Sequence, residues 1–310
     1  MNYIYPINQT KLYGLEKFIN ELIHLENSNN LPNKILLSGQ KGLGKSTLAF
    51  HFINYVLSKE EEYPYDIKNF EINNQNQSFK TMLNRSNLNF ILIDISNEKK
   101  SIDINQIRNL IMNLNKSSFN KKPRFILVDN IEFLNVNSIN ALLKVLEEPS
   151  INVHFILINN NKRILPTLLS RCINFKIHLS YEKNITIANR LLNNKLYETI
   201  NKDLINYYST PGTIYNLAMF AEENKYDLSN IDLKEFIKLI IKDNLFKKEN
   251  LIKHLIFDFI ELYFSKIDRS FFLDINSKYN YFLKKISDTK KFNLDEESLF
   301  IDFEEEILNG

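Results

Sequence analysis

A short stretch near the start of the chain has the residue spacing of a phosphate-binding loop. Residues 39–46 read GQKGLGKS and stand between an apolar run and a stretch with helical apolar spacing. Glycines let the backbone amides curl around phosphate groups, and the start of a helix adds its positive end. Lys45 would neutralise the β- and γ-phosphates of a nucleotide, and Ser46 would coordinate its Mg²⁺ ion. The predicted nucleotide-binding residues here are Gly39, Gly42, Gly44, Lys45, Ser46 and Thr47.

Asp129, the first residue after the apolar run 125–128, is a second candidate for the same site. A carboxylate at the end of a buried strand can contact Mg²⁺ directly or through water. We predict a magnesium site made by Asp129 and Ser46, and the alternative is an Asp that only caps the next turn. Asn130 follows, and a side-chain amide cannot act as a general base. Glu132 could take that part only with a shifted geometry, so the sequence favours weak ATP hydrolysis or none.

Strands that alternate with helices in the first half of the chain would position these residues. The predicted strands are residues 34–38, 89–94, 124–129, 153–158 and 173–177. The predicted helices are residues 46–57, a stretch that starts at Asp103 with Gln106 in capping-box position, and residues 137–148, which Pro149 ends. Near-continuous apolar strands between helices favour a parallel sheet covered on both faces. The predicted fold class is therefore α/β.

The strand pattern fades after residue 178. Short helices are predicted next, with a turn at residues 210–212, and from Asp232 onward the apolar spacing is helical to the end of the chain. Two polar stretches have the composition of linkers, residues 60–78 and residues 224–230. These changes predict three domains. Their bounds are residues 1–178, 179–223 and 224–310.

Composition and charge narrow the classes of protein further. The 310 residues include 39 Lys and Arg against 37 Asp and Glu, a balance that argues against a surface built entirely to grip nucleic acid. A local basic cluster that precedes Asp129 is a candidate for contact with nucleic-acid phosphates. The alternative is that it is only a solvated loop. The members of the cluster are Lys116, Lys121, Lys122 and Arg124. The single cysteine, Cys172, excludes an intramolecular disulfide and a cysteine-cluster zinc site, and we predict that it is a packing residue.

The sequence predicts neither a secretory signal nor a membrane span. The first residues show no charged segment followed by an apolar core, which a secretory signal would need. The longest apolar runs, such as residues 125–128 and 155–158, have the length of strands and not of membrane spans. A cytoplasmic protein without membrane contact is therefore expected.

Further motifs resemble those of clamp-loader subunits of bacterial DNA polymerase III, which are AAA+ proteins, and most of all the delta-prime subunits. Residues 140–149 read NALLKVLEEP and residues 170–172 read SRC, which look like two signatures of this family. Residues 104–108 resemble a segment before the Asp129 strand in the same proteins, and residues 292–295 resemble a short motif near the delta-prime C-terminus. The resemblance covers most of residues 1–220 and the remainder only weakly.

The resemblance implies an AAA+ phosphate-loop domain with a parallel sheet, a small helical lid and an all-helical C-terminal collar in which subunits associate. It implies that Arg171 is an arginine finger that acts in trans on a neighbour's ATP site. It also implies a polar sensor residue near the γ-phosphate, for which Asn159 and Asn160 are both candidates and Asn159 is our choice. ATP or ADP with Mg²⁺ is the expected cofactor. Aromatic residues in the last helices suit either subunit contact or a private core: Phe259, Tyr263, Phe264, Phe271 and Phe272.

The same resemblance implies a set of partners. These are the motor subunits and delta of the loader, the sliding clamp, and primed DNA, which would be contacted through its backbone. Contacts of that kind are independent of base sequence and weaken as salt rises.

Three departures from the family pattern bear on mechanism. Asn130 stands where hydrolysing relatives carry Glu, and Thr213 stands where active lids carry Arg after Pro-Gly. Residues 60–85 contain no cysteine where many relatives have a zinc module, so no zinc site is expected. We predict a non-motor stator subunit that supplies Arg171 to its neighbour. The alternatives are an ATP-hydrolysing motor subunit of the same loader, or a free-standing phosphate-loop module such as a helicase loader.

Overall fold

The computed structural model describes residues 5–95, 101–114, 120–147, 152–266, 272–292 and 294–309. The chain divides into two compact units. The first contains residues 2–187 together with the short segment Thr210–Thr213, and we call it the sheet unit. The second contains residues 188–209 and 214–310, and we call it the helical unit. Each is described by itself, and the three-domain division predicted from the sequence stays a prediction.

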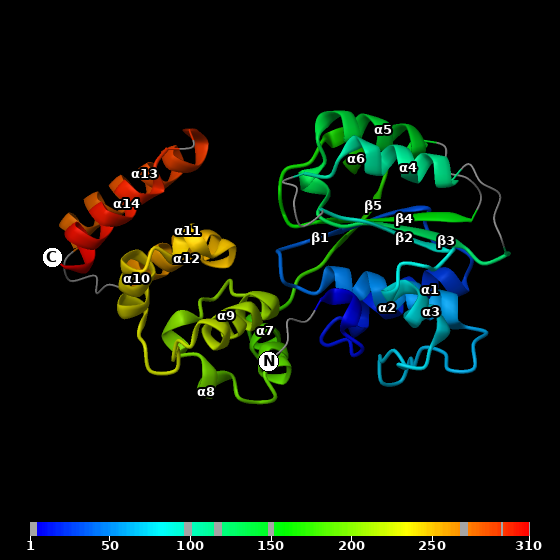
Figure 1. The fold of residues 1–310 in the computed structure, drawn as a ribbon, viewed down its shortest axis with the longest axis horizontal. Helices are drawn as coiled ribbons and strands as arrows, with labels where there is room; N and C mark the ends of the chain where they lie inside the picture. Colours follow the sequence, from blue (N-terminus) through cyan, green and yellow to red (C-terminus); the bar gives the residue numbers. More distant parts are fainter. Residues whose placement is uncertain are drawn as a thin grey trace. The chain divides into compact units, whose positions relative to one another are not determined.

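A five-stranded sheet forms the centre of the sheet unit (Figure 1). Its strands are β1 (Lys34–Ser38), β2 (Phe90–Ile93), β3 (Arg124–Val128), β4 (Val153–Asn159) and β5 (Ile173–Lys176). They lie in the order β2-β3-β4-β1-β5, and every neighbouring pair is parallel. All five strands were predicted, and their bounds differ from the prediction by one residue or less at most ends. The α/β class with a parallel sheet is confirmed.

Helices cover both faces of this sheet, as the parallel strands require. Figure 1 shows α1, α2 and α3 on one face and α4, α5 and α6 on the other. The helical segments of this unit are η1 (Pro6–Asn8), α1 (Glu16–Asn27), α2 (Lys45–Ser58), α3 (Gln77–Leu83), α4 (Ile104–Leu114), η2 (Ile131–Phe133), α5 (Val136–Glu147) and α6 (Pro166–Leu169). The predicted start at Asp103 is confirmed, because Asp103 N donates to Gln106 Oε1 at 2.9 Å. Pro149, predicted to end α5, lies outside the described residues.

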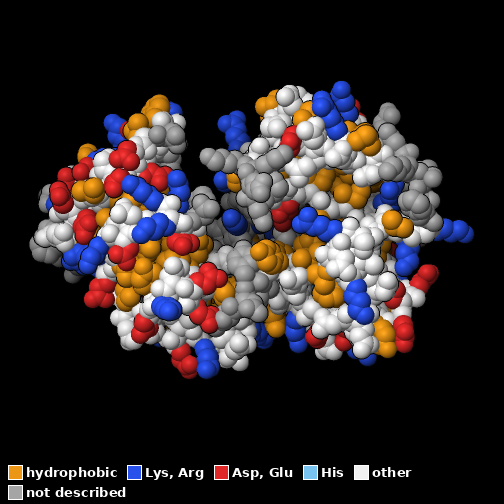
Figure 2. Space-filling view, in the orientation of Figure 1, with side chains coloured by type: hydrophobic (Ala, Val, Ile, Leu, Met, Phe, Trp, Pro, Cys, Tyr) orange, Lys and Arg blue, Asp and Glu red, His pale blue; other side chains and the backbone are white. Residues whose placement is uncertain are grey.

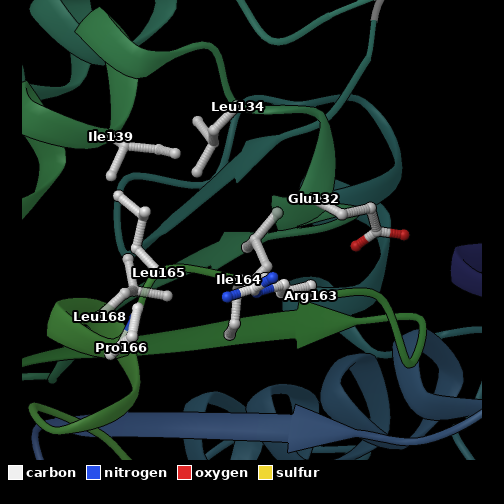
Figure 3. A pocket seen from close by; sticks show the side chains of 9 residues that line it. Glu132, Leu134, Ile139, Arg163, Ile164, Leu165, Pro166 and Leu168 are labelled. Carbon is white, nitrogen blue, oxygen red and sulfur yellow. The ribbon is translucent and has the colours of Figure 1, made fainter.

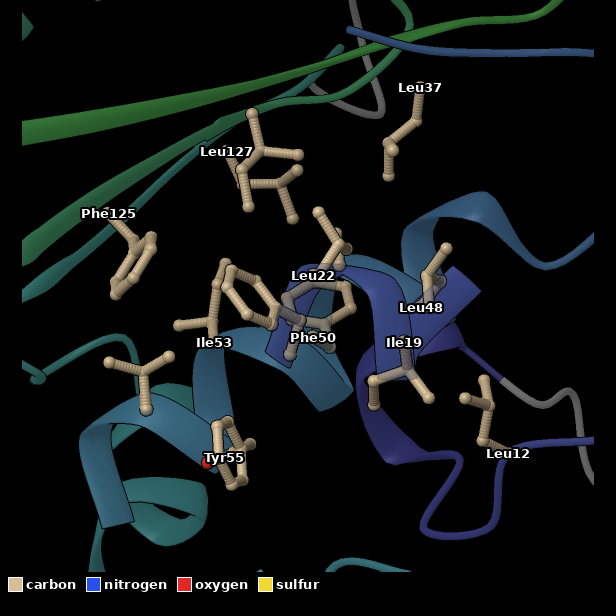
Figure 4. Close-up of a cluster of buried hydrophobic side chains, with 14 of the residues drawn as sticks. Leu12, Ile19, Leu22, Leu37, Leu48, Phe50, Ile53, Tyr55, Phe125 and Leu127 are labelled. Atoms are coloured by element: carbon tan, nitrogen blue, oxygen red, sulfur yellow. The ribbon is translucent and has the colours of Figure 1, made fainter. Parts of the chain in front are cut away.

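Alternate residues of each strand enter one of two apolar cores. Ile35 and Leu37 of β1 face the core under α1 and α2, which Figure 4 shows, whereas Leu36 faces the core under α4 and α5. The same alternation holds in β3, where Phe125 and Leu127 lie in the first core. Burial on both sides explains why the strands are apolar at nearly every position.

The polar stretch 60–78, predicted to be a linker, is instead attached to α2 by buried polar groups. Asn76 caps α3 by accepting a hydrogen bond from Phe79 N at 2.7 Å, and its Oδ1 also accepts one from Asn54 Nδ2 at 3.0 Å. His51 is fully buried and contacts the hydroxyl of Tyr65 at 3.0 Å. Sequence composition suggested a loose segment because it cannot show which polar residues find buried partners.

Every described secondary-structure element that lies wholly within the helical unit is helical, as predicted. Its elements are the end of α7 (Tyr181–Leu191), α8 (Leu196–Thr199), η3 (Lys202–Leu204), α9 (Pro211–Asn224) beyond residue 213, α10 (Leu233–Lys242), α11 (Leu245–Lys248), α12 (Asn250–Lys266), α13 (Phe272–Phe292), α14 (Glu296–Phe303) and the π-helical turn Glu304–Leu308. The turn predicted at residues 210–212 is wrong. Pro211 instead opens α9, because proline fits the first position of a helix, where no amide bond is lost.

Aromatic side chains form the helical unit's own core. Phe259 is 4% exposed and meets Phe236 edge to face at 5.3 Å between ring centroids. Phe264 lies 5.7 Å from Phe303, which is fully buried, and Phe303 lies 5.3 Å from Phe282. The sequence left open whether these aromatic residues make subunit contacts or pack inside their own unit. Phe259 and Phe264 pack in the core of the helical unit. Phe271 lies outside the described residues, as does the side chain of Phe272.

Candidate nucleotide-binding site

The predicted site residues meet at the carboxyl ends of β1, β3 and β4. Strand β4 lies between β1 and β3, with Ser38 paired to Asn159 and Val128 paired to Leu157. The loop after β1 and the residue after β3 are therefore brought together at one edge. In open parallel sheets, ligands bind at this edge, where the strand order reverses.

The phosphate-binding loop leads directly into α2. Gly44 precedes the helix with a left-handed backbone (φ 83°), a conformation that glycine adopts without strain. Lys45, the first residue of α2, is 3% exposed, and its Nζ donates to the carbonyl oxygens of Gly39 at 2.9 Å and Gln40 at 2.6 Å. Burial lowers the pKa of Lys45 to about 8, and the nearby carboxylates of Asp129 and Glu132 oppose that shift. A phosphate could replace the two carbonyls as the partner of this amine.

Ser46 and Asp129, the two predicted magnesium ligands, are in contact. Ser46 Oγ donates to Asp129 Oδ2 at 2.5 Å. Burial raises the pKa of Asp129 to about 6, the hydrogen bond from Ser46 opposes the shift, and the negative charge of Asp94 adds to it. A hydroxyl and a carboxylate suit Mg²⁺, which prefers oxygen ligands and keeps several waters. Their function in metal binding stays a prediction.

Asn130 is fixed by hydrogen bonds on both sides of its amide. Its Nδ2 donates to Asp94 Oδ1 at 2.8 Å, and its Oδ1 accepts from Asn160 Nδ2 at 2.7 Å. Its backbone is left-handed (φ 56°), and its N–H donates to Asp129 Oδ1 at 2.8 Å. Asn130 therefore links Asp94 and Asn160 in a hydrogen-bonded network, and its side chain has no carboxylate that could take a proton from a water molecule.

The two candidate sensor residues have different surroundings. Asn159 is 6% exposed, and its amide bonds the backbone of Lys162, donating at 2.9 Å and accepting at 3.1 Å. Asn160 instead bonds Asn130 and Glu132, with 2.9 Å from its Nδ2 to Glu132 Oε1. Asn160 is thus the one whose side chain joins the Asp129 end of the site, and a nucleotide contact by Asn159 stays a prediction.

Arg171, the predicted trans arginine, lies on the side of the sheet unit that carries α5 and α6. Its Nη2 donates to Glu147 Oε1 at 2.7 Å, and its Nη1 donates to Thr167 O at 2.7 Å. Both side chains of the ion pair are accessible, 31% for Arg171 and 55% for Glu147. An exposed pair of this kind is worth at most about 1 kcal/mol, so the guanidinium can leave it at little cost.

The neighbouring Cys172 fits a packing residue. It is partly buried against the core under α5, and burial raises the pKa of its thiol to about 11. A thiol with a raised pKa is a poor nucleophile at neutral pH.

Two parts of the site could not be found from sequence spacing. Asp94 directly follows β2, and only the sheet order shows that it stands beside Asn130. The segment Thr210–Thr213 contacts the phosphate loop from far along the chain, with Thr210 Oγ1 donating to Lys41 O at 2.9 Å. The one sequence signal for Asp94 is that it directly follows an apolar strand, as Asp129 does, but this signal does not reveal its neighbour.

An apolar cavity of about 380 Å³ lies next to Glu132 (Figure 3). Glu132 and Arg163 give it a charged side, and aliphatic side chains such as Ile139, Leu165 and Leu168 line the rest. The cavity lies between η2, α5 and α6, and α5 and α6 also carry the two hydrogen-bond partners of Arg171.

The predicted basic cluster is partly used within the protein. Lys122 Nζ donates to Leu57 O at 2.7 Å, and Arg124 Nη2 donates to Asn113 O at 3.1 Å. Lys116 lies outside the described residues. On the face seen in Figure 2, basic and acidic side chains are interspersed over the helical unit.

Membrane and metal sites were also sought in the described part of the chain. No helix there combines the length and apolar character that a membrane crossing needs. In the same residues, no three or more His, Cys, Asp and Glu side chains are grouped so that they could hold a metal ion.

Comparison with known proteins identifies the family. The profile of the family described as DNA polymerase III, delta subunit, matches residues 14–180, which is more than half of the chain. The delta-prime subunit of Buchnera aphidicola subsp. Schizaphis graminum is 25% identical over 86% of this chain and 82% of its own length. The gamma/tau subunit of Mycoplasma genitalium is 29% identical over 55% of this chain, which spans only 27% of that subunit.

Among solved structures, a DNA polymerase III gamma subunit-related protein from Thermotoga maritima aligns with a TM-score of 0.49 and 18% identity, over 91% of this chain and 96% of that one. The match to the family profile decides the assignment, and the parallel sheet and the phosphate loop of this chain agree with it. This chain belongs to the DNA polymerase III delta-subunit family and is of the delta-prime/gamma type.

Proposed function

We propose that this chain is the stator subunit of a DNA polymerase III clamp loader, and that it supplies Arg171 to the ATP site of a neighbouring motor subunit. The observation that carries the proposal is the state of Asn130. Its amide is held between Asp94 and Asn160, so the position that would orient an attacking water has neither a carboxylate nor freedom to move. Glu132 is also engaged by Asn160, which disfavours its use as a substitute base.

The surface position of Arg171 supports action on a neighbour. Its hydrogen bonds run to α5 and α6 and not to the phosphate loop, and about a third of its side chain is exposed. A guanidinium placed against a departing γ-phosphate stabilises negative charge there, and such arginines are worth about 10³–10⁵ in rate. The reaction belongs to the neighbour, and this chain contributes the cation.

We further propose that the chain's own site binds ATP or ADP with Mg²⁺ without efficient turnover. The loop amides would hold the phosphates, Lys45 would neutralise them, and Ser46 with Asp129 would hold the metal ion. A bound nucleotide would then serve mainly to fix the shape of the site.

The proposed partners are the motor subunits and delta, the sliding clamp, and primed DNA contacted through its phosphates. The lid of residues 179–223 and the collar of residues 224–310 are proposed as separate domains, with the collar in subunit contacts. A replication protein of this kind would work in the cytoplasm. The helical content of the region and its own aromatic core support a folded collar.

A motor subunit is the second candidate, because the phosphate loop is complete and gamma-type subunits are among the relatives. ATP hydrolysis by the loader, reconstituted with its own partners, separates the two. We expect Arg171→Ala to lower the rate at least 100-fold, while Lys45→Ala leaves it within about twofold. Arg85→Ala, at an exposed arginine of the same unit, is the control and should change nothing.

The reverse result would identify a motor. If Lys45→Ala abolishes hydrolysis and Arg171→Ala is silent, the chain turns over ATP itself and the stator proposal is wrong. A chain that stays monomeric with all purified loader subunits would instead favour a free-standing phosphate-loop module such as a helicase loader.

A further inference from the structure

The four residues Thr210–Thr213 lie against the phosphate loop. Thr210 is 3% exposed, and its Oγ1 donates to Lys41 O at 2.9 Å. Gly212 N donates to Gly42 O at 2.9 Å. This segment belongs to the sheet unit although the chain on both sides of it belongs to the helical unit. Two consecutive carbonyls of the loop are thus bonded to one distant segment.

The approach of the two backbones depends on glycine in both segments. A Cβ atom on Gly212 would lie 2.8 Å from the Cα of Gly42. A Cβ atom on Gly42 would lie 2.2 Å from Thr210 Oγ1, and Gly42 also has a positive φ of 86°. At Gly212 the contact is therefore backbone against backbone, and at Gly42 it is backbone against the buried hydroxyl of Thr210.

Thr213 completes the arrangement by fixing the direction of the Thr210 hydroxyl. The two hydroxyl oxygens are 2.8 Å apart, and Thr213 N donates to Thr210 Oγ1 at 3.3 Å. Because Thr210 accepts from Thr213, its own hydrogen is directed to Lys41 O. Thr213 stands where active lids of the resembling family carry an arginine, and it has no positive charge. In this chain its function is to orient the Thr210 hydroxyl.

The accepted hydrogen bonds act on the amides that would hold phosphate. The carbonyl of Lys41 shares a peptide group with the N–H of Gly42, and the carbonyl of Gly42 shares one with the N–H of Leu43. A hydrogen bond accepted by a carbonyl polarises its peptide and strengthens the N–H as a donor. In a phosphate loop, these inward N–H groups cradle the α- and β-phosphates.

We propose that Thr210–Thr213 is a latch that orients the phosphate loop and strengthens its amides, with Thr210 as the positioning residue. The ligand is a nucleoside di- or triphosphate, and this inference rests on the nucleotide site proposed above. Because the amides concerned serve the inner phosphates, the latch supports ADP and ATP equally. It differs in this from Lys45, which also serves the γ-phosphate.

Three variants of the full-length chain test the latch. Thr210→Val keeps the shape and removes the donor, Thr210→Ser keeps the donor, and Thr186→Val removes an exposed hydroxyl that bonds only within its own helix. Binding of ADP and ATP with Mg²⁺ is measured by calorimetry. Thr210→Val should weaken both nucleotides by roughly fivefold to tenfold. Thr210→Ser and Thr186→Val should match the wild type.

A second measurement needs no nucleotide. Backbone hydrogen exchange of residues 39–46 in the apo chain should be faster in Thr210→Val, and in Gly212→Ala, than in Thr186→Val. Gly212→Ala is the independent variant if Thr210→Val does not fold.

The outcomes separate the latch from the nucleotide proposal. Faster loop exchange in a chain that binds neither nucleotide supports the latch and removes the proposed ligand. Unchanged exchange in both variants, or weakened binding of ATP with intact binding of ADP, overturns the latch. Loss of affinity in Thr210→Ser equal to that in Thr210→Val also overturns it, because the hydroxyl would then not be the cause.

Discussion

The ionised carboxylate of Asp129 lowers the stability of the folded chain. Burial raises its pKa to about 6, and the carboxylate of Asp94 adds to that shift. A carboxyl group whose pKa is higher folded than unfolded destabilises the fold once both states are ionised. The stabilising protonated form is present in full below the ordinary pKa near 4, and its contribution is lost as the pH rises through 6. Sites kept for binding commonly show such a cost.

Replacing Asp129 with Asn should therefore stabilise the apo protein at neutral pH. We expect Asp129→Asn to raise the melting temperature of the sheet unit by roughly 3–6 °C at pH 7.5 and by less at pH 5, since Asp129 is mostly protonated there. Thermal melts at the two pH values measure the difference. Glu62→Gln, at an exposed carboxyl of the same unit, is the control. A gain at pH 5 as large as that at pH 7.5 would show that the charge is not the cause.

His51 gives the opposite pH dependence. Burial lowers its pKa to about 4, so the ring is neutral in the folded chain at physiological pH. Stability from the neutral ring is present above the ordinary pKa of 6.5 and is lost as the pH falls from 6.5 towards 4. The sheet unit should thus lose melting temperature over that range, and His51→Phe should flatten the slope below pH 6.5. Equal slopes in both proteins would contradict this.

At the scale of elements, α3 depends on one polar side chain. Asn76 caps the helix, bonds Asn54 of α2, and donates to Tyr63 O at 2.9 Å. Because Phe79 and Asn54 are buried, loss of Asn76 leaves polar groups of both without a partner. These polar contacts hold residues 60–78 against α2.

Asn76→Ala should cost about 2–4 kcal/mol of unfolding free energy for the sheet unit, from the lost cap and the unpaired buried groups. Asn73→Ala, at an exposed position three residues earlier, should cost less than about 1 kcal/mol. Urea unfolding followed by far-ultraviolet circular dichroism measures both. Similar midpoints for the two variants would mean that the buried network is not what anchors α3.

Elements were predictable from the sequence wherever local spacing determines them. The strands are apolar runs and followed from the hydrophobic pattern, and the phosphate loop is a contiguous motif between a strand and a helix and followed from its residue spacing. The contacts that shape the site are not local. Asp94 meets Asn130 and Thr210 meets Lys41 only because of the sheet order and the return of the chain, which no residue spacing encodes. The choice between Asn159 and Asn160 was open for the same reason.

Over the whole molecule, the helical unit has a core of its own, separate from those of the sheet unit, and this implies two unfolding units. Phe303 is fully buried in the helical unit and contacts the rings of Phe264, Phe282 and Tyr263. No residue of the sheet unit's two cores comes from α14. Damage to one core should therefore leave the other in place.

Phe303→Ala should lower the melting temperature of the helical unit by about 8–15 °C, from a cost of about 3–5 kcal/mol, and leave the sheet unit unchanged. Ile301→Ala, at a position 44% exposed in the same helix, is the control and should shift neither transition by more than about 2 °C. Calorimetry with limited proteolysis assigns each transition. A single transition that moves as one would show that the units unfold together.

The ion pair between Arg171 and Glu147 has a consequence for assembly. A guanidinium that already holds a carboxylate and a carbonyl does not gain partners when it reaches a neighbour; it trades them. Under the proposed trans role, complex formation would then depend little on Arg171, and its removal would alter catalysis far more than association. The positive charge of Arg171 would then contribute little to binding between the subunits, and it would stabilise the complex mainly in the transition state, when negative charge develops on the γ-phosphate.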